Sequence, residues 1–214
     1  GDTVVFEDEI TPALDAVLAS GLEISAIHNH FAFHRPPVYF MHLGGHGDPN
    51  ALAARVKSVW DANRGVRAKQ DRPGERFPGE LPAAGSLDAA ALGAIMGREA
   101  ERQGHVVKVT IPREGKAHGV AIAGSMGLTT WAAFSGSDAR ASVDGDFIMT
   151  GSEVQAVIRA LRKAGIHVVA LHNHMLDEEP RFFFLHYWGK GPAADLARGV
   201  RSALEAERAP VPGA

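Results

Sequence analysis

Hydrophobic positions in the last third of the chain follow a helical period. Four apolar residues recur at intervals of three and four and predict one buried helix face: Val154, Val157, Ile158 and Leu161. The preceding Thr150-Gly-Ser-Glu153 is typical of a capping box, in which threonine and glutamate satisfy free backbone amides. Gly165 supplies a stop. We therefore expect a helix between these two signals.

The period then changes to that of strands. Residues 166–174 and 182–187 are rich in β-branched and aromatic side chains, which predicts two strands joined by a turn over residues 175–181. Helical spacing returns over residues 194–206, where Leu196, Val200 and Leu204 share a face. This part of the chain is therefore expected to fold as helix, strand, strand, helix (αββα).

The same pattern occurs at the start of the chain. Residues 1–62 align with residues 145–206 without a gap, and 19 of the 62 pairs are identical. A repeat of this length predicts two copies of one supersecondary unit. The first copy should thus hold a helix to about Ser20, strands at 22–30 and 38–43, and a helix at 50–62. Pro12 is tolerable only in a first helical turn, so the first helix begins late or kinks.

The segment between the copies has a different composition. Residues 63–86 are rich in Arg, Gly and Pro and predict an exposed linker. Residues 87–103 are expected to form a helix, and 106–111, 118–124, 128–134 and 141–149 short strands. The expected domains are a first repeat at 1–62, the linker at 63–86, a helix and strand block at 87–144, a second repeat at 145–206 and a tail at 207–214.

The fold class that follows is α+β. We expect two pseudo-symmetric αββα units with additional antiparallel strands in one compact body. No strand block like that of the second copy precedes the first. Either the upstream strands of the first unit were cleaved or lost, or only the αββα part was duplicated.

Three histidines keep their register between the copies. His28, His30 and His42 align with His172, His174 and His186. Residues i and i+2 of a strand share a face, so the first two histidines of each group project together. We expect a pairing register in which opposed residue numbers add up to 70 in the first hairpin and 358 in the second. In this register His28 lies directly opposite His42, and His172 directly opposite His186. Asn29 and Asn173 point to the other face, where structural hydrogen bonds are expected.

Three converging imidazoles predict a metal site. Opposed strand residues have Cβ atoms ~4.5–5.5 Å apart, which allows three nitrogens to reach one ion at ~2.0–2.1 Å. The expected cofactor is a divalent transition metal, with zinc first and iron, manganese, nickel or copper as alternatives. The predicted metal ligands are therefore His172, His174 and His186 in one copy and His28, His30 and His42 in the other.

Two further residues complete a hypothetical active site. Glu178, in the turn of the second hairpin, is a candidate fourth ligand or general base, and Arg181 could bind a substrate carboxylate. The first copy has His34 where the second has Glu178. An open coordination position would lower the pKa of bound water toward ~7 and make it a nucleophile. This predicts a metal-dependent enzyme acting on a small polar substrate.

Other interpretations stay open at this point. The chain is alternatively a non-catalytic metal- or ligand-binding protein of the cell envelope, and one copy alone could bind metal. A metal-free acid–base or anion site, or purely structural histidines, would also retain these residues.

Composition narrows the classes of partner. The net charge of −3, without a Lys/Arg cluster, argues against nucleic acid and anionic membranes. The absence of cysteine excludes disulfides, thiolate zinc sites and iron–sulfur clusters. No apolar run approaches the ~18 residues of a membrane span. A small-molecule ligand is the expected partner, and the sequence leaves the oligomeric state open.

Two long runs resemble a known family. These are the stretch from His172-Asn-His-Met-Leu-Asp-Glu-Glu-Pro-Arg to Tyr187-Trp-Gly-Lys-Gly and the run Phe40-Met-His-Leu-Gly-Gly-His-Gly-Asp-Pro, and both resemble the LppY/LpqO family of bacterial proteins. Gly127-Leu-Thr-Thr-Trp-Ala-Ala-Phe and Asp144-Gly-Asp-Phe fit as well. The resemblance implies no established activity, because that family is a domain of unknown function. It does imply an extracytoplasmic location, since its members are often exported or lipid-anchored. His34 departs from the acidic residue expected there.

Overall fold

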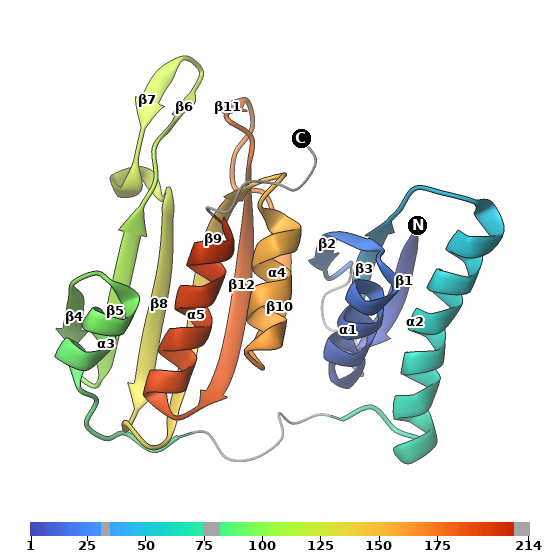
Figure 1. Ribbon diagram of the computed structural model, residues 1–214, viewed down its shortest axis with the longest axis horizontal. Helices are drawn as coiled ribbons and strands as arrows, with labels where there is room; N and C mark the ends of the chain where they lie inside the picture. Colours follow the sequence, from blue (N-terminus) through green and yellow to red (C-terminus); the bar gives the residue numbers. More distant parts are fainter. Residues whose placement is uncertain (31–34, 75–81, 208–214) are drawn as a thin grey trace. The chain divides into compact units, whose positions relative to one another are not determined.

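The chain folds into two compact units, which a computed structural model describes over residues 1–30, 35–74 and 82–207 (Figure 1). Unit 1 comprises Gly1–Glu80 and unit 2 comprises Leu81–Ala214. The boundary between them falls within the segment predicted as a linker. Of the part of the chain that the structure describes, no helix is both long and apolar enough to cross a membrane.

Unit 1 is an antiparallel sheet with two helices. The strands follow the order β1-β3-β2. In chain order the elements are β1 (Asp2–Phe6), the 3-10 helix η1 (Glu7–Glu9), α1 (Ile10–Ser20), β2 (Glu23–His28), β3 (Val38–Gly44) and α2 (Pro49–Lys69). Helix α1 buries Leu14 and Val17, and Pro12 lies in its first turn, where a missing N–H costs nothing. Asp48 caps α2 by accepting hydrogen bonds from the Asn50 and Ala51 backbone amides at 3.0 Å.

Two expectations for unit 1 were wrong. Strand β1 precedes the first helix, so the unit is βαββα; the strand alternates exposed and buried residues, with Thr3 and Val5 inward. Helix α2 continues seven residues past the predicted end at residue 62. The polar extension is held by tertiary contacts, because Arg67 pairs with Asp8 and Glu9 of the first helical segment. A linker composition cannot reveal such contacts.

Unit 2 is built on a larger antiparallel sheet. Its strands follow the order β10-β12-β9-β8-β5-β4, and a smaller sheet has the order β11-β6-β7. The strands are β4 (Ala100–Gln103), β5 (Val106–Pro112), β6 (Gly115–Ala117), β7 (Val120–Ile122), β8 (Thr129–Gly136), β9 (Ala141–Thr150), β10 (His167–His172), β11 (Glu178–Glu179) and β12 (Phe182–Gly191). The helices are α3 (Ala89–Met96), η2 (Gly124–Met126), α4 (Val154–Lys163) and α5 (Ala193–Glu207).

Three expectations for unit 2 need correction. The helix predicted over 87–103 ends at Met96, where Gly97 adopts φ 65°, and residues 100–103 form β4 instead. The strand predicted over 118–124 is the second arm of the β6–β7 hairpin followed by η2. The turn predicted over 175–181 contains β11, which pairs with β6. Each error concerns an element of only two to four residues, which is too short for a sequence period to define. Of these, β4 and β7 pair with neighbouring strands, and β11 pairs with a distant one.

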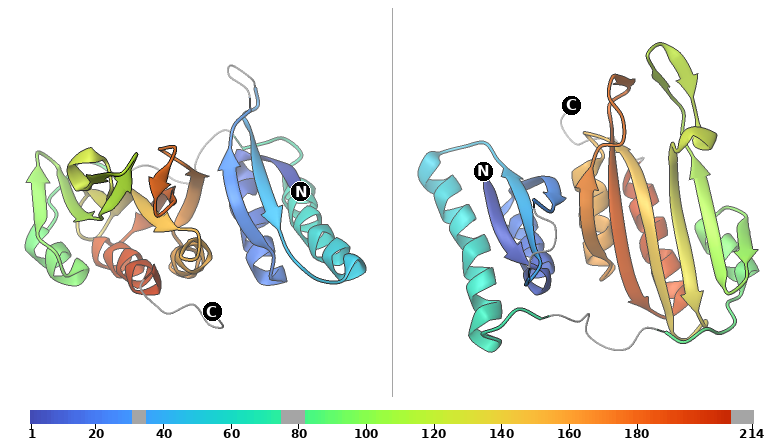
Figure 2. Two further views of the ribbon diagram at one scale, coloured as in Figure 1. Left: turned by 90° about the horizontal axis from the view of Figure 1, so that it is seen from above. Right: turned by 180° about the vertical axis from the view of Figure 1, so that it is seen from behind.

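Helices α3, α4 and α5 cover one face of the larger sheet, as the view from above shows (Figure 2). A Cβ atom on Gly189 would lie 3.2 Å from Leu196 of α5, so this position of β12 faces the helices. Leu185 and Tyr187 share that side and are buried. His186 and Trp188 alternate with them and therefore lie on the opposite face. This second face carries the histidines.

A hydrophobic cluster closes part of the second face. It consists of Ile122, Leu128, Ile148, Phe182 and Phe184, with Met175 and Ala117 packed against it. The residues come from the larger sheet and from the small β11-β6-β7 sheet with its flanking loops. The small sheet thus shields the end of the hairpin next to the histidines.

The two units share an element order. Each contains strand, helix, strand, strand, helix, with sheet order β1-β3-β2 in unit 1 and β9-β12-β10 in unit 2. The α+β class with antiparallel sheets is confirmed. The predicted αββα segments are present, each preceded by a strand.

Candidate metal sites

Unit 2 brings His172, His174 and His186 together. One ligand atom from each lies within 4.8 Å of the others. His172 ends β10, His174 follows it, and His186 lies in the middle of β12. The ring of His172 lies 4.9 Å from each of the other two, centroid to centroid. His172 and His186 are half-buried and His174 is exposed.

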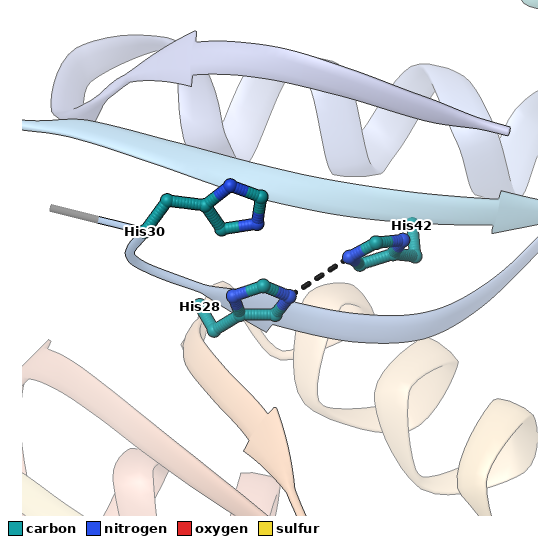
Figure 3. A group of neighbouring side chains, drawn as sticks. All are labelled: His28, His30 and His42. Atoms are coloured by element: carbon teal, nitrogen blue, oxygen red, sulfur yellow. Dashed lines mark hydrogen bonds between the residues drawn. The ribbon is translucent and has the colours of Figure 1, made fainter.

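Unit 1 forms the same arrangement from His28, His30 and His42, whose ligand atoms also lie within 4.8 Å of one another. Figure 3 shows the three rings gathered beside the β2–β3 hairpin. Nε2 of His28 lies 2.8 Å from Nε2 of His42. Two nitrogens this close share either a proton or a cation, because two lone pairs would repel each other.

The predicted pairing register was wrong by two residues in both hairpins. His186 pairs with Ala170, and His172 pairs with Phe184. In unit 1, correspondingly, His28 pairs with Phe40. Because side chains alternate with a period of two, a shift of two residues leaves every side chain on its expected face. The histidines therefore converge although the predicted partners were not the right ones.

The second histidine of each group stacks on a phenylalanine. The His174 ring stacks on Phe184 with centroids 3.5 Å apart, and His30 stacks on Phe40 at 3.4 Å. Partial burial lowers the pKa of His174, and the nearby charges of His172 and His186 lower it further. This imidazole therefore favours its neutral form, which is the form that ligates a metal.

Backbone carbonyls fix the tautomer of one histidine in each group. Nδ1 of His172 lies 3.4 Å from the Asn173 carbonyl, and Nδ1 of His28 lies 3.3 Å from that of Asn29. A carbonyl only accepts, so the contact favours the tautomer that carries its proton on Nδ1 and keeps the lone pair on Nε2. Metal-ligating histidines commonly use such an arrangement.

The two asparagines next to these histidines have structural partners. Asn173 donates from Nδ2 to the Phe182 carbonyl at 2.9 Å. The side chain of Asn29 hydrogen-bonds Tyr39, whose pKa is nevertheless raised, first by burial and then by the charge of Glu7. The predicted structural role of both asparagines agrees with these contacts.

A buried carboxylate, that of Asp146, lies next to His186. Asp146 of β9 pairs with His186 across the ladder, and its side chain is 7% exposed. Oδ1 of Asp146 lies 4.0 Å from Nδ1 of His186 and has no hydrogen-bond partner. Burial raises the pKa of Asp146, although the charges of His186 and His172 act in the opposite direction. Sequence reasoning missed this residue, although Asp146 aligns with an identical Asp2 in the first copy.

Glu178 is not gathered with the histidines. Glu178 is buried at 5% exposure, and its Oε1 accepts a hydrogen bond from the Phe182 backbone amide at 3.1 Å. Its other carboxylate oxygen is buried without a partner. Arg181 is exposed. The group of ligand atoms within 4.8 Å comprises three histidines and excludes Glu178. The corresponding His34 lies outside the described residues.

Comparison with known proteins gives a family but no activity. Among curated proteins, none matches this chain. A crystal structure of a trimeric bacterial microcompartment shell protein, PduB, aligns with 93% of this chain and 70% of its own at 12% identity and a TM-score of 0.24. That score is too low to indicate a shared fold. A family model described as Domain of Unknown Function (DUF1259) matches residues 1–62 and 90–206. The matched residues include the six histidines of the two groups. The chain therefore belongs to the DUF1259 family.

Proposed function

We propose that this protein binds a divalent transition metal through His172, His174 and His186, and a second one through His28, His30 and His42. The supporting observation is the occurrence, twice, of three imidazole ligand atoms within 4.8 Å of one another. Zinc suits an all-nitrogen ligand set, whereas calcium and magnesium prefer oxygen. Iron, manganese, nickel and copper are the alternatives.

The spacing suits a single ion. Two nitrogens on a tetrahedral zinc at ~2.0–2.1 Å are roughly 3.3 Å apart. The 2.8 Å between Nε2 of His28 and Nε2 of His42 is somewhat shorter, and the upper limit of 4.8 Å within each group is longer. Small side-chain rotations therefore bring three nitrogens to bonding distance, with no change in the strands.

Three protein ligands would leave one coordination position for water or a ligand. Within the described ranges, each group offers three histidines and no carboxylate. His174 is exposed, so the ion would be reachable from solvent. Zinc with three histidines and a water is the arrangement that generates hydroxide near neutral pH. We propose a small polar or carboxylate-bearing ligand at this position, with a metal-dependent hydrolytic or Lewis-acid activity as the enzymatic form of the hypothesis.

Glu178 and Arg181 enter this hypothesis as second-rank candidates. Glu178 has an unpartnered buried oxygen that would suit a proton acceptor, and the exposed Arg181 could bind a substrate carboxylate. The alternative function is non-catalytic binding of metal or ligand in the cell envelope. It rests on the resemblance to the LppY/LpqO family, which would also place the protein outside the cytoplasm.

The first experiment is elemental analysis of the purified, tag-free protein by inductively coupled plasma mass spectrometry. We expect about two equivalents of a transition metal, or their uptake from a panel of divalent ions. His174→Ala should remove about one equivalent and leave the fold intact, because this side chain is exposed. His105→Ala is the matched control, since His105 is an exposed histidine in a turn outside both groups.

The outcomes separate the hypotheses. If the wild-type protein contained no metal and took up none from the panel, the metal-site hypothesis would be refuted. Acid–base or structural roles would then remain for the histidines. Metal that is retained by His174→Ala would place the ion elsewhere. The identity of the bound element would then direct assays toward hydrolysis or redox chemistry.

A further inference from the structure

We infer that Asp146 is a positioning residue for the unit 2 metal site: it accepts a hydrogen bond from Nδ1 of His186 and so directs Nε2 toward the ion. The inference rests on the metal binding proposed above and deepens it. In this arrangement Asp146 hydrogen-bonds a metal-binding histidine and does not bind the metal itself.

The first support is a buried carboxylate oxygen without a partner. Asp146 is 5% exposed, yet its Oδ1 has no hydrogen bond. Buried polar atoms nearly always have a partner, so an unsatisfied carboxylate oxygen needs an explanation. Nδ1 of His186 lies 4.0 Å from this oxygen, while the backbone amides of Leu185 and Phe147 hydrogen-bond the same carboxylate. Shortening that distance by about one ångström would make a charge-assisted hydrogen bond.

The second support is the strand register. Asp146 of β9 and His186 of β12 are directly paired residues, so both side chains rise from the same face of the sheet. The partner of His186 on its other side is Ala170, which offers no side-chain acceptor. The ladder thus offers His186 one paired acceptor, and that acceptor is a carboxylate.

The third support is the pattern of the other ring nitrogens. Nδ1 of His172 already contacts the Asn173 carbonyl, which leaves its Nε2 for the ion. A hydrogen-bond acceptor at Nδ1 of His186 would place the proton of this ring on Nδ1 as well and leave its Nε2 for the ion. A carboxylate in that position raises the basicity of the imidazole and fixes its orientation.

The two units differ in this feature. Asp2 pairs with His42 in unit 1 as Asp146 pairs with His186 in unit 2, but Asp2 is exposed. A hydrogen bond to an exposed carboxylate competes with water and contributes less. Unit 2 is therefore the site in which the outer carboxylate should matter most.

The test measures zinc affinity by chelator competition in a His28→Ala background, which leaves the unit 2 site as the main binder. Asp146→Asn should weaken zinc binding ~10- to 100-fold, the usual effect of losing an outer-shell partner. Asp144→Asn is the matched control. It removes the same charge from the same face of β9, but Asp144 is exposed and pairs with Trp188 rather than His186.

A second readout distinguishes positioning from a general loss of structure. Long-range proton–nitrogen correlation spectra of the zinc-loaded protein report which ring nitrogen of each histidine carries the proton. We expect a protonated Nδ1 on His186 in the wild type and a shifted Nδ1 resonance in Asp146→Asn.

Each result counts for or against the inference. Equal losses of zinc affinity in Asp146→Asn and Asp144→Asn would be explained by the change in net charge alone. This result would overturn the positioning role of Asp146. Unchanged affinity in Asp146→Asn, or a His186 that binds zinc through Nδ1, would also overturn it while the proposed function stands. A wild-type protein that binds no zinc or other divalent ion would overturn both.

Discussion

Gly145 lies at the tightest backbone approach next to the unit 2 site, and its replacement by alanine tests the packing directly. A Cβ atom at this position would lie 2.3 Å from the Trp131 carbonyl oxygen and 2.3 Å from Oη of Tyr187. Both distances are far below van der Waals contact. The carbonyl belongs to the neighbouring strand β8 and cannot rotate away, so the backbone of β8 or β9 must shift, and Tyr187 must move as well.

The cost follows from what surrounds Tyr187. Its side chain is 1% exposed, and its hydroxyl donates a hydrogen bond to the Trp131 carbonyl at 3.0 Å. Overpacking a core costs ~1–3 kcal/mol. A tyrosine displaced from its acceptor leaves a buried hydroxyl unsatisfied, at ~1–3 kcal/mol more. We therefore expect Gly145→Ala to lower the free energy of unfolding by about 2–6 kcal/mol.

The assay is urea denaturation followed by tryptophan fluorescence and far-ultraviolet circular dichroism. With a slope of ~2 kcal/mol per molar urea, the expected loss moves the midpoint down by about 1–3 M. Trp131 and Trp188 report on unit 2, whereas Trp60 lies in unit 1. A transition of unit 1 that stays in place would locate the damage in unit 2.

Gly151→Ala is the control. A Cβ atom there would meet only Cε2 of Phe183, at an ordinary contact of 3.5 Å. Its free energy of unfolding should stay within ~0.5 kcal/mol of the wild type. If Gly145→Ala were equally neutral, the close approach of β8, β9 and Tyr187 would not exist as described, and the placement of Asp146 beside it would lose its basis.

Two further predictions concern ionic and capping contacts. Burial raises the pKa of Glu153, but hydrogen bonds from Arg113 at 2.8 Å and from the Thr150 amide, with the charge of Arg113, outweigh it and hold the pKa below its usual 4.5. Glu153 thus stabilises the fold above pH 4.5 and loses this effect as the pH falls through its lowered pKa. Glu153→Gln should show a shallower acid-side loss of stability in urea melts at several pH values, and an unchanged profile would refute the assignment. Asp48→Ala should cost ~1 kcal/mol in thermal melts because α2 loses its N-cap, whereas Asp48→Ser should restore most of it.

Local chemistry was enough to predict much of this protein. The apolar stripe of α4, with Val157, Ile158 and Leu161 buried, needs only a helical period. Glu153 reaches back to the Thr150 amide, as its spacing predicts. The reciprocal half of the predicted capping box is absent, because the helix begins at Val154 and the Thr150 hydroxyl contacts Ser152 instead. The two histidine groups were predictable for another reason. Strand alternation fixes which side chains share a face, and an error of two residues in register does not change that face.

The register itself was decided by tertiary structure. The segment between β10 and β12 is too long for a tight turn to fix the pairing, and an irregularity lies between Val168 and Ala170. The packing of two sheet faces therefore determines which residues are opposed. The same holds for β11, whose pairing with β6 takes Glu178 into a buried position outside the histidine group.

The sequence by itself determined which histidines come together, because strand periodicity and the internal repeat are both properties of the sequence itself. Only the tertiary structure decided which other side chains lie next to these histidines. Asp146 lies forty residues before His186, and no short-range pattern brings the two together. Their proximity arises from the β9–β12 pairing, a long-range contact.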